Sequence, residues 1–185
     1  MLRQPSQADP IVTVEPLAVR RSGPVRWMVA REYIEGPLLS RVAKALHIIS
    51  VGRSGVDTKA TKAAIRYAKQ GWLVGMFPEG RINLTDELLR PARPGAALVA
   101  LRAKVPVIPC YIEGAPEAGS LIAPLFSTAK ARVVVGSPID LGEYEGRENR
   151  RQMQEELTLR MMREIARLAG RDDFEPQLAG RRWKT

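Results

Sequence analysis

The sequence predicts a single α/β domain, in which helices flank a mostly parallel sheet. Short apolar runs alternate with longer amphipathic segments along the chain, and glycine and proline residues separate them. The 185 residues suffice for one domain, because a chain of this length buries about 70% of the surface that its unfolded form exposes. We expect the domain over residues 1–170, followed by a polar C-terminal extension over residues 171–185.

The amino-terminal part of this domain predicts strands that alternate with helices. Apolar side chains recur at helical spacing between Leu38 and Leu46. A second helix begins where Asp57 or Thr58 can cap it, and Gly71 is a natural end for it. The expected elements, in chain order, are a strand at 25–29, a helix at 38–46, a strand at 48–51, a helix at 58–69 and a strand at 72–77.

The remaining elements continue the same alternation. Segments 72–77 and 105–112 are almost entirely apolar, which is typical of strands that are buried on both faces of a parallel sheet. Pro106 and Pro109 nevertheless suit an edge or irregular strand better than a central one. The expected elements are a helix at 95–103, strands at 105–112 and 132–135, and a final amphipathic helix at 149–168.

The positive net charge of the chain points to negatively charged partners. There are 29 Lys+Arg against 20 Asp+Glu, which gives a formal net charge of +9. Such a surplus attracts anionic lipid, anionic substrates or nucleic acid, and composition alone leaves all three open. The low aromatic content, 5%, disfavours a base-stacking surface. One group of basic residues is either a solvated face or a surface for lipid or CoA phosphates: Arg20, Arg21, Arg26, Arg31, Arg41 and Lys44.

The cysteine and histidine content excludes several kinds of site. The single cysteine, Cys110, rules out an intramolecular disulfide framework, and no Cys/His cluster suits zinc, so a reducing compartment is expected. We expect Cys110 to be a small core residue, and His47 to be a core or helix-end residue without a catalytic role. No signal-peptide core and no uncharged apolar run of about 18 residues occurs, so the chain is expected to lie on a bilayer at most.

The most informative motif is Phe77-Pro78-Glu79-Gly80-Arg81, directly after an expected buried strand. The carboxyl ends of parallel strands open onto the ligand crevice of a sheet, so a charged cluster is well placed there. Pro78 fixes the turn, Gly80 lets the backbone approach a ligand, and Arg81 offers a planar fork that suits phosphate. The plainer interpretation is a strand-to-loop turn with a solvated Glu-Arg pair.

Three further blocks accompany this motif. They are Gln4-Pro5-Ser6-Gln7-Ala8-Asp9, Ile49-Ser50-Val51-Gly52-Arg53 and Val105-Pro106-Val107-Ile108-Pro109. In this order, the four blocks resemble the motifs of the glycerolipid acyltransferase family, which includes the 1-acyl-glycerol-3-phosphate acyltransferases. The resemblance extends over residues 3–140, and its Phe-Pro-Glu-Gly block is specific. It implies the fold of that family and a peripheral protein at the cytoplasmic face of the membrane.

The resemblance also implies a reaction and a phosphate site. The reaction moves a fatty acyl group from acyl-CoA or acyl-carrier protein to the hydroxyl of a lysophosphatidic-acid-like acceptor, without a metal, a redox cofactor or a nucleic-acid partner. Arg53, Glu79 and Gly80 match positions that bind or orient the glycerophosphate. Arg81 lies where the family usually has threonine or another arginine, and the strand ending at Pro109 matches the block on the acyl-donor side.

The catalytic pair of the family is altered in this chain. In the family, a histidine accepts the proton of the attacking hydroxyl, and an aspartate five residues later orients the imidazole. Asp9 matches that aspartate, but Gln4 occupies the histidine position, and an amide cannot take a proton near neutral pH. Family members also usually place a strand and helices before the first motif. Only residues 1–3 precede it here, so we expect those elements to be absent.

Gln4 therefore keeps an alternative open, namely a catalytically silent relative that binds lipid or acyl donor. A second alternative is a basic nucleic-acid-binding domain. It is disfavoured, because the basic residues are interleaved with the motif blocks and do not form one aromatic-studded face.

Overall fold

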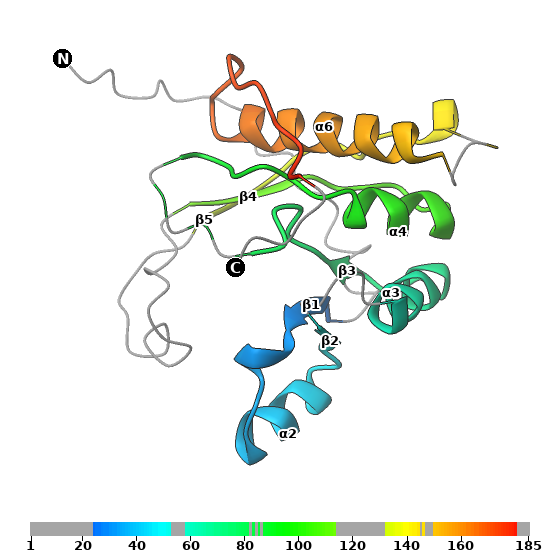
Figure 1. Cartoon of the computed structure of the whole chain (residues 1–185), viewed down its shortest axis with the longest axis vertical. Coiled ribbons are helices and arrows are strands. Elements are labelled where there is room, and N and C mark those ends of the chain that lie inside the picture. The colour runs from blue at the N-terminus through cyan, green and yellow to red at the C-terminus, as the bar shows by residue number, and fades with distance from the viewer. Residues whose placement is uncertain are drawn as a thin grey trace.

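The computed structural model describes residues 24–52, 58–81, 83, 85, 87–113, 132–144, 146 and 150–180. Strands and helices alternate along it as an α/β fold (Figure 1). The elements are β1 (Arg26–Ala30), a 3-10 helix (Arg31–Tyr33), α2 (Pro37–Ala45), β2 (Ile49–Val51), α3 (Thr58–Lys69), β3 (Val74–Gly75), α4 (Gly95–Ala103), β4 (Cys110–Glu113), β5 (Arg132–Val135), a 3-10 helix (Gly142–Tyr144) and α6 (Arg151–Leu168). Every expected helix is confirmed to within a few residues.

The amino-terminal strands form a parallel sheet with the order β2-β1-β3. Met28 pairs with Ile49 and Arg26 pairs with Val74, so β1 is the central strand. Parallel neighbours need a crossover connection, and the segments that contain α2 and α3 supply these connections. The expected parallel sheet is therefore confirmed in this half of the chain.

The second half departs from the expected strands. β4 and β5 pair antiparallel in a sheet of their own. The strand expected at 105–112 begins only at Cys110, because Pro106 and Pro109 have no amide hydrogen to donate to a ladder. Val107 instead forms an isolated antiparallel bridge with Ile139.

The strands are also less buried than their apolar sequences predicted. β3 has only two residues and is half-buried, at one edge of the described parallel sheet. Trp27 of β1 covers Gly75 so closely that a Cβ there would lie 2.4 Å from the indole ring. Cys110 is exposed, so its prediction as a core residue is wrong. The reason is that β4 pairs with β5 outside the parallel sheet.

The buried core is built mainly from helices. Figure 1 shows α4 between α3 and α6, and α4 packs against both of them. One cluster joins Ala97 and Leu101 of α4 to Leu157 and Met161 of α6. A second cluster joins Val99 of α4 to residues of β2 and α3. α4 thus links the two halves of the chain.

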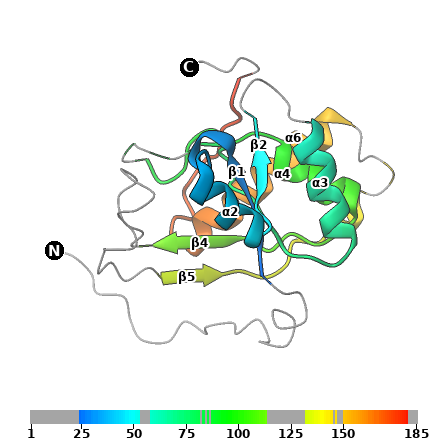
Figure 2. The same cartoon turned by 90° about the horizontal axis from the view of Figure 1, so that it is seen from below.

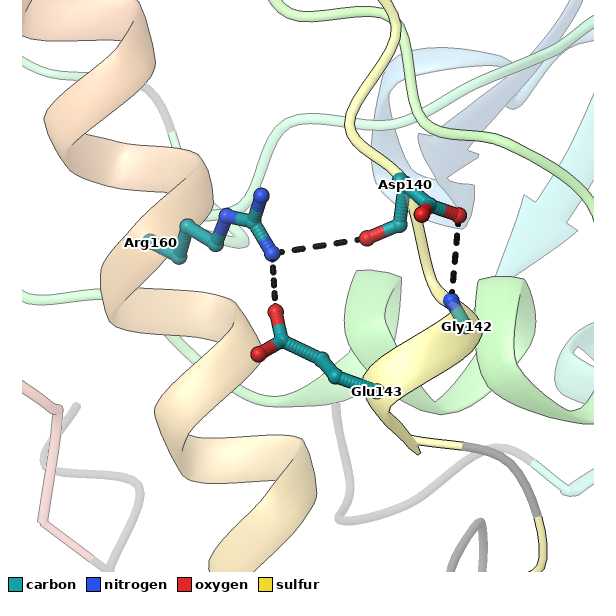
Figure 3. A network of polar contacts seen from close by, with 4 residues as sticks. All are labelled: Asp140, Gly142, Glu143 and Arg160. Carbon is teal, nitrogen blue, oxygen red and sulfur yellow. Dashed lines mark hydrogen bonds and ion pairs between the residues drawn. The ribbon is translucent and has the colours of Figure 1, made fainter.

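A polar network holds the second 3-10 helix against α6 (Figure 3). Arg160 of α6 donates hydrogen bonds to the Glu143 carboxylate and, over 3.4 Å, to the backbone oxygen of Asp140. The Gly142 N–H donates to Asp140 Oδ1 over 3.1 Å. Tyr144 of the same 3-10 helix is buried in the cluster between α4 and α6. The network is exposed and its groups are committed to one another, so we interpret it as a structural brace.

His47 lies just beyond α2, where its φ of 52° is left-handed. Its N–H donates to the Lys44 oxygen over 3.1 Å, and the Ile48 N–H donates to the Ala43 oxygen over 2.8 Å. These bonds satisfy carbonyls that the end of a helix would otherwise leave without partners. The side chain is exposed, so His47 is a helix-end residue and not a core residue.

Within the described residues, no helix has the length and hydropathy that a membrane span requires.

Candidate functional site: the turn after β3

The Phe77–Arg81 motif forms a tight turn just after β3. The Gly80 N–H donates to the Phe77 oxygen over 3.1 Å. Gly80 has a φ of +69°, a conformation that costs any residue with a Cβ roughly 1–2 kcal/mol. The shape of the turn therefore favours glycine at this position, and the turn lies beyond the carboxyl end of a parallel strand, as the sequence predicted.

The segment after this turn folds back and closes on it. The Glu79 Oε2 accepts a hydrogen bond from the Arg90 N–H over 3.0 Å, and the Arg93 N–H donates to the Pro78 oxygen over 2.8 Å. Residues 78–79 and 90–93 thus lie side by side, although the loop between them is about ten residues long. These two hydrogen bonds hold residues 90 and 93 against the motif.

The carboxylate of Glu79 binds the backbone of this loop at Arg90. The side chain is half-buried, and burial raises its pKa, while the hydrogen bond from the Arg90 N–H and the charge of Arg90 lower the pKa to a smaller extent. A carboxylate also repels a phosphate of like charge. We therefore interpret Glu79 as a residue that positions the loop and not as a phosphate ligand. The resemblance implies a residue that binds or orients the glycerophosphate, and that role stays a prediction.

Two arginines meet beside Gly80. The Cδ of Arg93 would lie 3.5 Å from a Cβ placed on Gly80, so the stem of Arg93 runs directly over the turn. Burial lowers the pKa of Arg93, and the positive charge of the nearby Arg81 lowers it further. Two guanidinium groups within each other's field create a positive potential that favours an anion.

The start of α4 strengthens the same potential. Arg93 is two residues before Gly95, the first residue of α4, and no side chain caps this helix end. The amino end of a helix carries a partial positive charge and free N–H groups, so it attracts anions and disfavours cations. The sequence analysis missed Arg93. An arginine two residues before an expected helix was the signal that could have found it, because a cation near a helix start is unfavourable unless an anion binds.

The segment after α6 returns to this loop. The Ala92 N–H donates to the Gln177 oxygen over 2.8 Å, and the Ala179 N–H donates to the Ala92 oxygen over 2.8 Å. Leu178 accordingly forms a parallel bridge with Ala92, next to Arg93. In Figure 1 this segment is the red loop that runs back from the end of α6. Part of the expected polar extension thus supports the site loop through its backbone.

An exposed aromatic pair adjoins the turn. Trp27 and Phe77 stack with their ring centroids 5.5 Å apart, and both rings are partly open to solvent. Phe77 is also the residue whose oxygen accepts the Gly80 hydrogen bond. An apolar surface therefore lies next to the turn that carries Arg81, which suits an amphiphilic ligand.

Arg26 is buried, with an exposed fraction of only 6%. The prediction that it belongs to a basic surface, either solvated or in contact with phosphates, is therefore wrong. Its guanidinium carbon lies 4.2 Å from the ring centroid of Tyr67 and 4.1 Å from that of Trp72, and within the described residues its Nε has no hydrogen-bond partner. Two aromatic faces stabilise this cation in place of water. Arg26 thus fastens β1 to α3 and offers no charge to a ligand.

The structure brings together Glu79, Gly80 and Arg81 of the predicted site and adds Arg90 and Arg93 to them. Gln4, Asp9 and Arg53 lie outside the described residues. Their predicted roles stay predictions. Among the described residues, no group of three or more His, Cys, Asp or Glu side chains could hold a metal ion.

The chain belongs to the acyltransferase family, whose sequence model matches residues 5–113. Over 120 residues it is 26% identical to the 1-acyl-sn-glycerol-3-phosphate acyltransferase of Bacillus subtilis (strain 168). These aligned residues make up 65% of this chain and 57% of the relative. A probable 1-acyl-sn-glycerol-3-phosphate acyltransferase of Mycoplasma genitalium is 25% identical over 111 residues, 59% of this chain and 41% of the relative.

A solved structure supports the fold. The crystal structure of the 1-acyl-sn-glycerophosphate (LPA) acyltransferase PlsC from Thermotoga maritima aligns with a TM-score of 0.50 and 18% sequence identity, over 78% of this chain and 56% of that one. The predicted α/β fold of this family is confirmed by the likeness. The chain spans about half the length of the relatives that it matches.

Proposed function

We propose that this protein transfers a fatty acyl group from a thioester donor to the free hydroxyl of a lysophosphatidic-acid-like acceptor. The observation that carries the proposal is the pair Arg81 and Arg93 beside the Gly80 turn, next to an exposed aromatic pair. An arginine fork suits a phosphate, and the aromatic surface suits an acyl chain. Family membership and the named relatives favour this chemistry over other phosphate ligands.

The proposed reaction exchanges one acyl bond for another. The acceptor hydroxyl oxygen attacks the thioester carbonyl, a new C–O ester bond forms, and the C–S bond to the carrier breaks. The hydroxyl proton ends on the sulfur of the released thiol. Arg81 and Arg93 hold the acceptor phosphate, which fixes the hydroxyl in reach of the thioester, and such positioning can lower a barrier by several kcal/mol. Glu79 and Arg90 hold the loop in the shape that this requires.

The proton of the attacking hydroxyl needs an acceptor, and Gln4 cannot be one. General-base catalysis contributes roughly 10²–10⁴-fold to such a step, so the proposed activity is slow unless another group replaces the histidine. Gln4 therefore favours a second candidate, a silent family relative that binds lipid or acyl donor. We propose acyl-CoA or acyl-carrier protein as donor, peripheral work at the cytoplasmic face of the membrane, and no need for a metal or redox cofactor.

The test is a turnover assay on the full chain with lysophosphatidic acid and acyl-CoA or acyl-carrier protein. Gln4→His should raise turnover roughly 10²–10⁴-fold if the histidine position is catalytic. Arg93→Gln should raise the KM for lysophosphatidic acid about tenfold, because a charge-assisted hydrogen bond is worth about 1.5–3 kcal/mol. Arg102→Gln is the matched control on the exposed side of α4, and its KM should change less than about twofold.

Each contrary result has a distinct meaning. Equal and substantial turnover of the wild type and the Gln4→His variant would remove the histidine position from the mechanism. An unchanged KM in Arg93→Gln would remove Arg93 from the phosphate site. No turnover by either the wild type or Gln4→His, with lysophosphatidic acid still bound, would leave the silent lipid-binding relative as the function.

A further inference from the structure

The helix α2 presents its apolar face to solvent. Leu38 is 71% exposed, Val42 is 45% exposed and Leu46, just past the helix, is 52% exposed. These residues are four apart, so they lie on one face, and Leu39 widens that face. Only Ala43 of this helix is buried. An amphipathic helix normally buries such a face against its own domain, and here the core is covered by α3, α4 and α6.

The place of α2 in the molecule explains why its face is open. Figure 1 shows α2 at the far end of the molecule from α6, and Figure 2 shows it from below, in front of the strands. It is attached through Ala43 and through its connections to β1 and β2. Its apolar side chains therefore have no neighbouring helix to cover them among the described residues.

The charges on α2 select the kind of surface that could cover it. The helix contains no acidic residue, and it carries Arg41 and Lys44, both exposed. At about 100° of rotation per residue, Arg41 borders the apolar face, while Lys44 lies on the opposite side. Glu32 and Glu35 precede the helix, but the chain as a whole has a net charge of +9. An apolar face that is bordered by Arg41 suits a negatively charged layer over an apolar one.

A second copy of the chain fits this surface less well. A stable protein interface buries roughly 800 Å² on each partner, which the four apolar side chains of α2 and its C-terminal end do not supply. A bilayer sets no such minimum, because an amphipathic helix with basic residues binds by placing its apolar face between the head groups and acyl chains. Basic side chains near an anionic leaflet add to the attraction.

We propose that α2 is the helix with which this protein lies on an anionic lipid bilayer. Leu38, Val42 and Leu46 enter the acyl-chain region, Arg41 lies against lipid phosphates, and Lys44 adds long-range attraction. The proposal rests on the proposed function, since a lipid acceptor is the reason for this protein to meet a bilayer. The binding itself requires no turnover.

The experiment is sedimentation of the full chain with vesicles that contain neither lysophosphatidic acid nor thioester. Vesicles of phosphatidylcholine with phosphatidylglycerol are compared with vesicles of phosphatidylcholine alone. We expect the wild type to bind the anionic vesicles more strongly. The double variant Leu38→Gln/Leu46→Gln should lower its partition at least about tenfold, because each leucine loses the free energy of burial.

Two further variants complete the design. Ile112→Gln/Val133→Gln is the matched control, because these apolar side chains are also exposed but belong to β4 and β5. Its partition should stay within about twofold of the wild type. Arg41→Glu/Lys44→Glu should reduce binding to anionic vesicles about tenfold or more, because each basic residue near the surface adds about 1 kcal/mol, and it should leave the weak binding to neutral vesicles unchanged. Thermal unfolding of each variant verifies its folding.

Other results would overturn the proposal. They are wild-type binding by Leu38→Gln/Leu46→Gln, an equal loss in the β4–β5 control, or no vesicle binding by the wild type. A wild-type dimer without lipid that becomes a monomer in Leu38→Gln/Leu46→Gln would show that a second copy covers α2. A chain that binds vesicles through α2 but transfers no acyl group would refute the proposed function and leave this surface in place.

Discussion

Two helices of this protein carry similar apolar stripes and have opposite surroundings. In α6 the stripe includes Leu157 and Met161, and both side chains are buried against α4. In α2 the stripe of Leu38, Val42 and Leu46 faces solvent. In both helices the apolar residues are four positions apart, which places them on one face. A stripe therefore predicts a helix and the direction of its apolar face, but the partner of that face depends on what lies next to it.

The two helices also differ in how they end. Both continue into a residue with left-handed backbone, which is Gly170 after α6 and His47 after α2. Glycine adopts this conformation without a steric cost, while a residue with a Cβ pays for it. The well-packed helix thus has the favourable terminal residue, and the exposed helix has a strained one.

The largest expected difference between the helices concerns their leucines. Leu157→Ala should lower the free energy of unfolding by about 2–5 kcal/mol, because it leaves a cavity in a packed core. Leu38→Ala should change it by less than about 0.5 kcal/mol, because its side chain is already in water. Urea unfolding followed by circular dichroism measures both. Similar losses at the two positions would mean that α2 is packed in solution.

A smaller effect is expected where α2 meets the domain. Ala43→Leu should lower the free energy of unfolding by about 1–3 kcal/mol, because Ala43 is buried and added atoms strain a packed site. Ala45→Leu, in the same helix but exposed, is the matched control and should change it by less than about 0.5 kcal/mol. The comparison uses the same urea assay. Equal tolerance of leucine at both positions would show that Ala43 does not hold α2 in place.

The smallest effects, with opposite signs, are expected at the two helix ends. His47→Gly should stabilise the protein by about 1 kcal/mol, because glycine removes the steric cost of the left-handed backbone. Gly170→Ala should destabilise it by about 1 kcal/mol for the same reason. Melting temperatures of the two variants and the wild type provide the measurement. Shifts of the same sign in both variants would contradict this account of the helix ends.

Local patterns predicted the helices well and the strands less well. Helical spacing and terminal residues place a helix from nearby residues alone, and the helices at 58–69 and 95–103 matched closely. Burial of a strand depends on its neighbours. The apolar segments at 72–77 and 105–112 were both expected to be strands of the parallel sheet, the second with prolines that suit an edge or irregular strand. The first is the short edge strand β3, and the second gave β4 in a separate antiparallel pair.

The candidate site was predictable only where it follows the chain. The Glu79-Gly80-Arg81 turn could be found because its residues are consecutive and come directly after a strand. Arg93 and Ala179 could not be found in this way. A loop separates Arg93 from the motif, and the helices α4 and α6 with the strands between them separate Ala179 from it. Their contacts with Gly80 and Ala92 exist only after the chain folds back.

The sequence by itself determined the α/β class, the helices with their apolar faces, and the glycine-dependent turn after β3, since each follows from local spacing or backbone sterics. The tertiary structure decided which apolar faces found partners and which side chains joined the turn. It buried Arg26 between two rings, placed Arg93 beside Gly80, and left α2 with an open face. The physical reason is that burial and charge proximity depend on distances in space, which sequence separation does not fix.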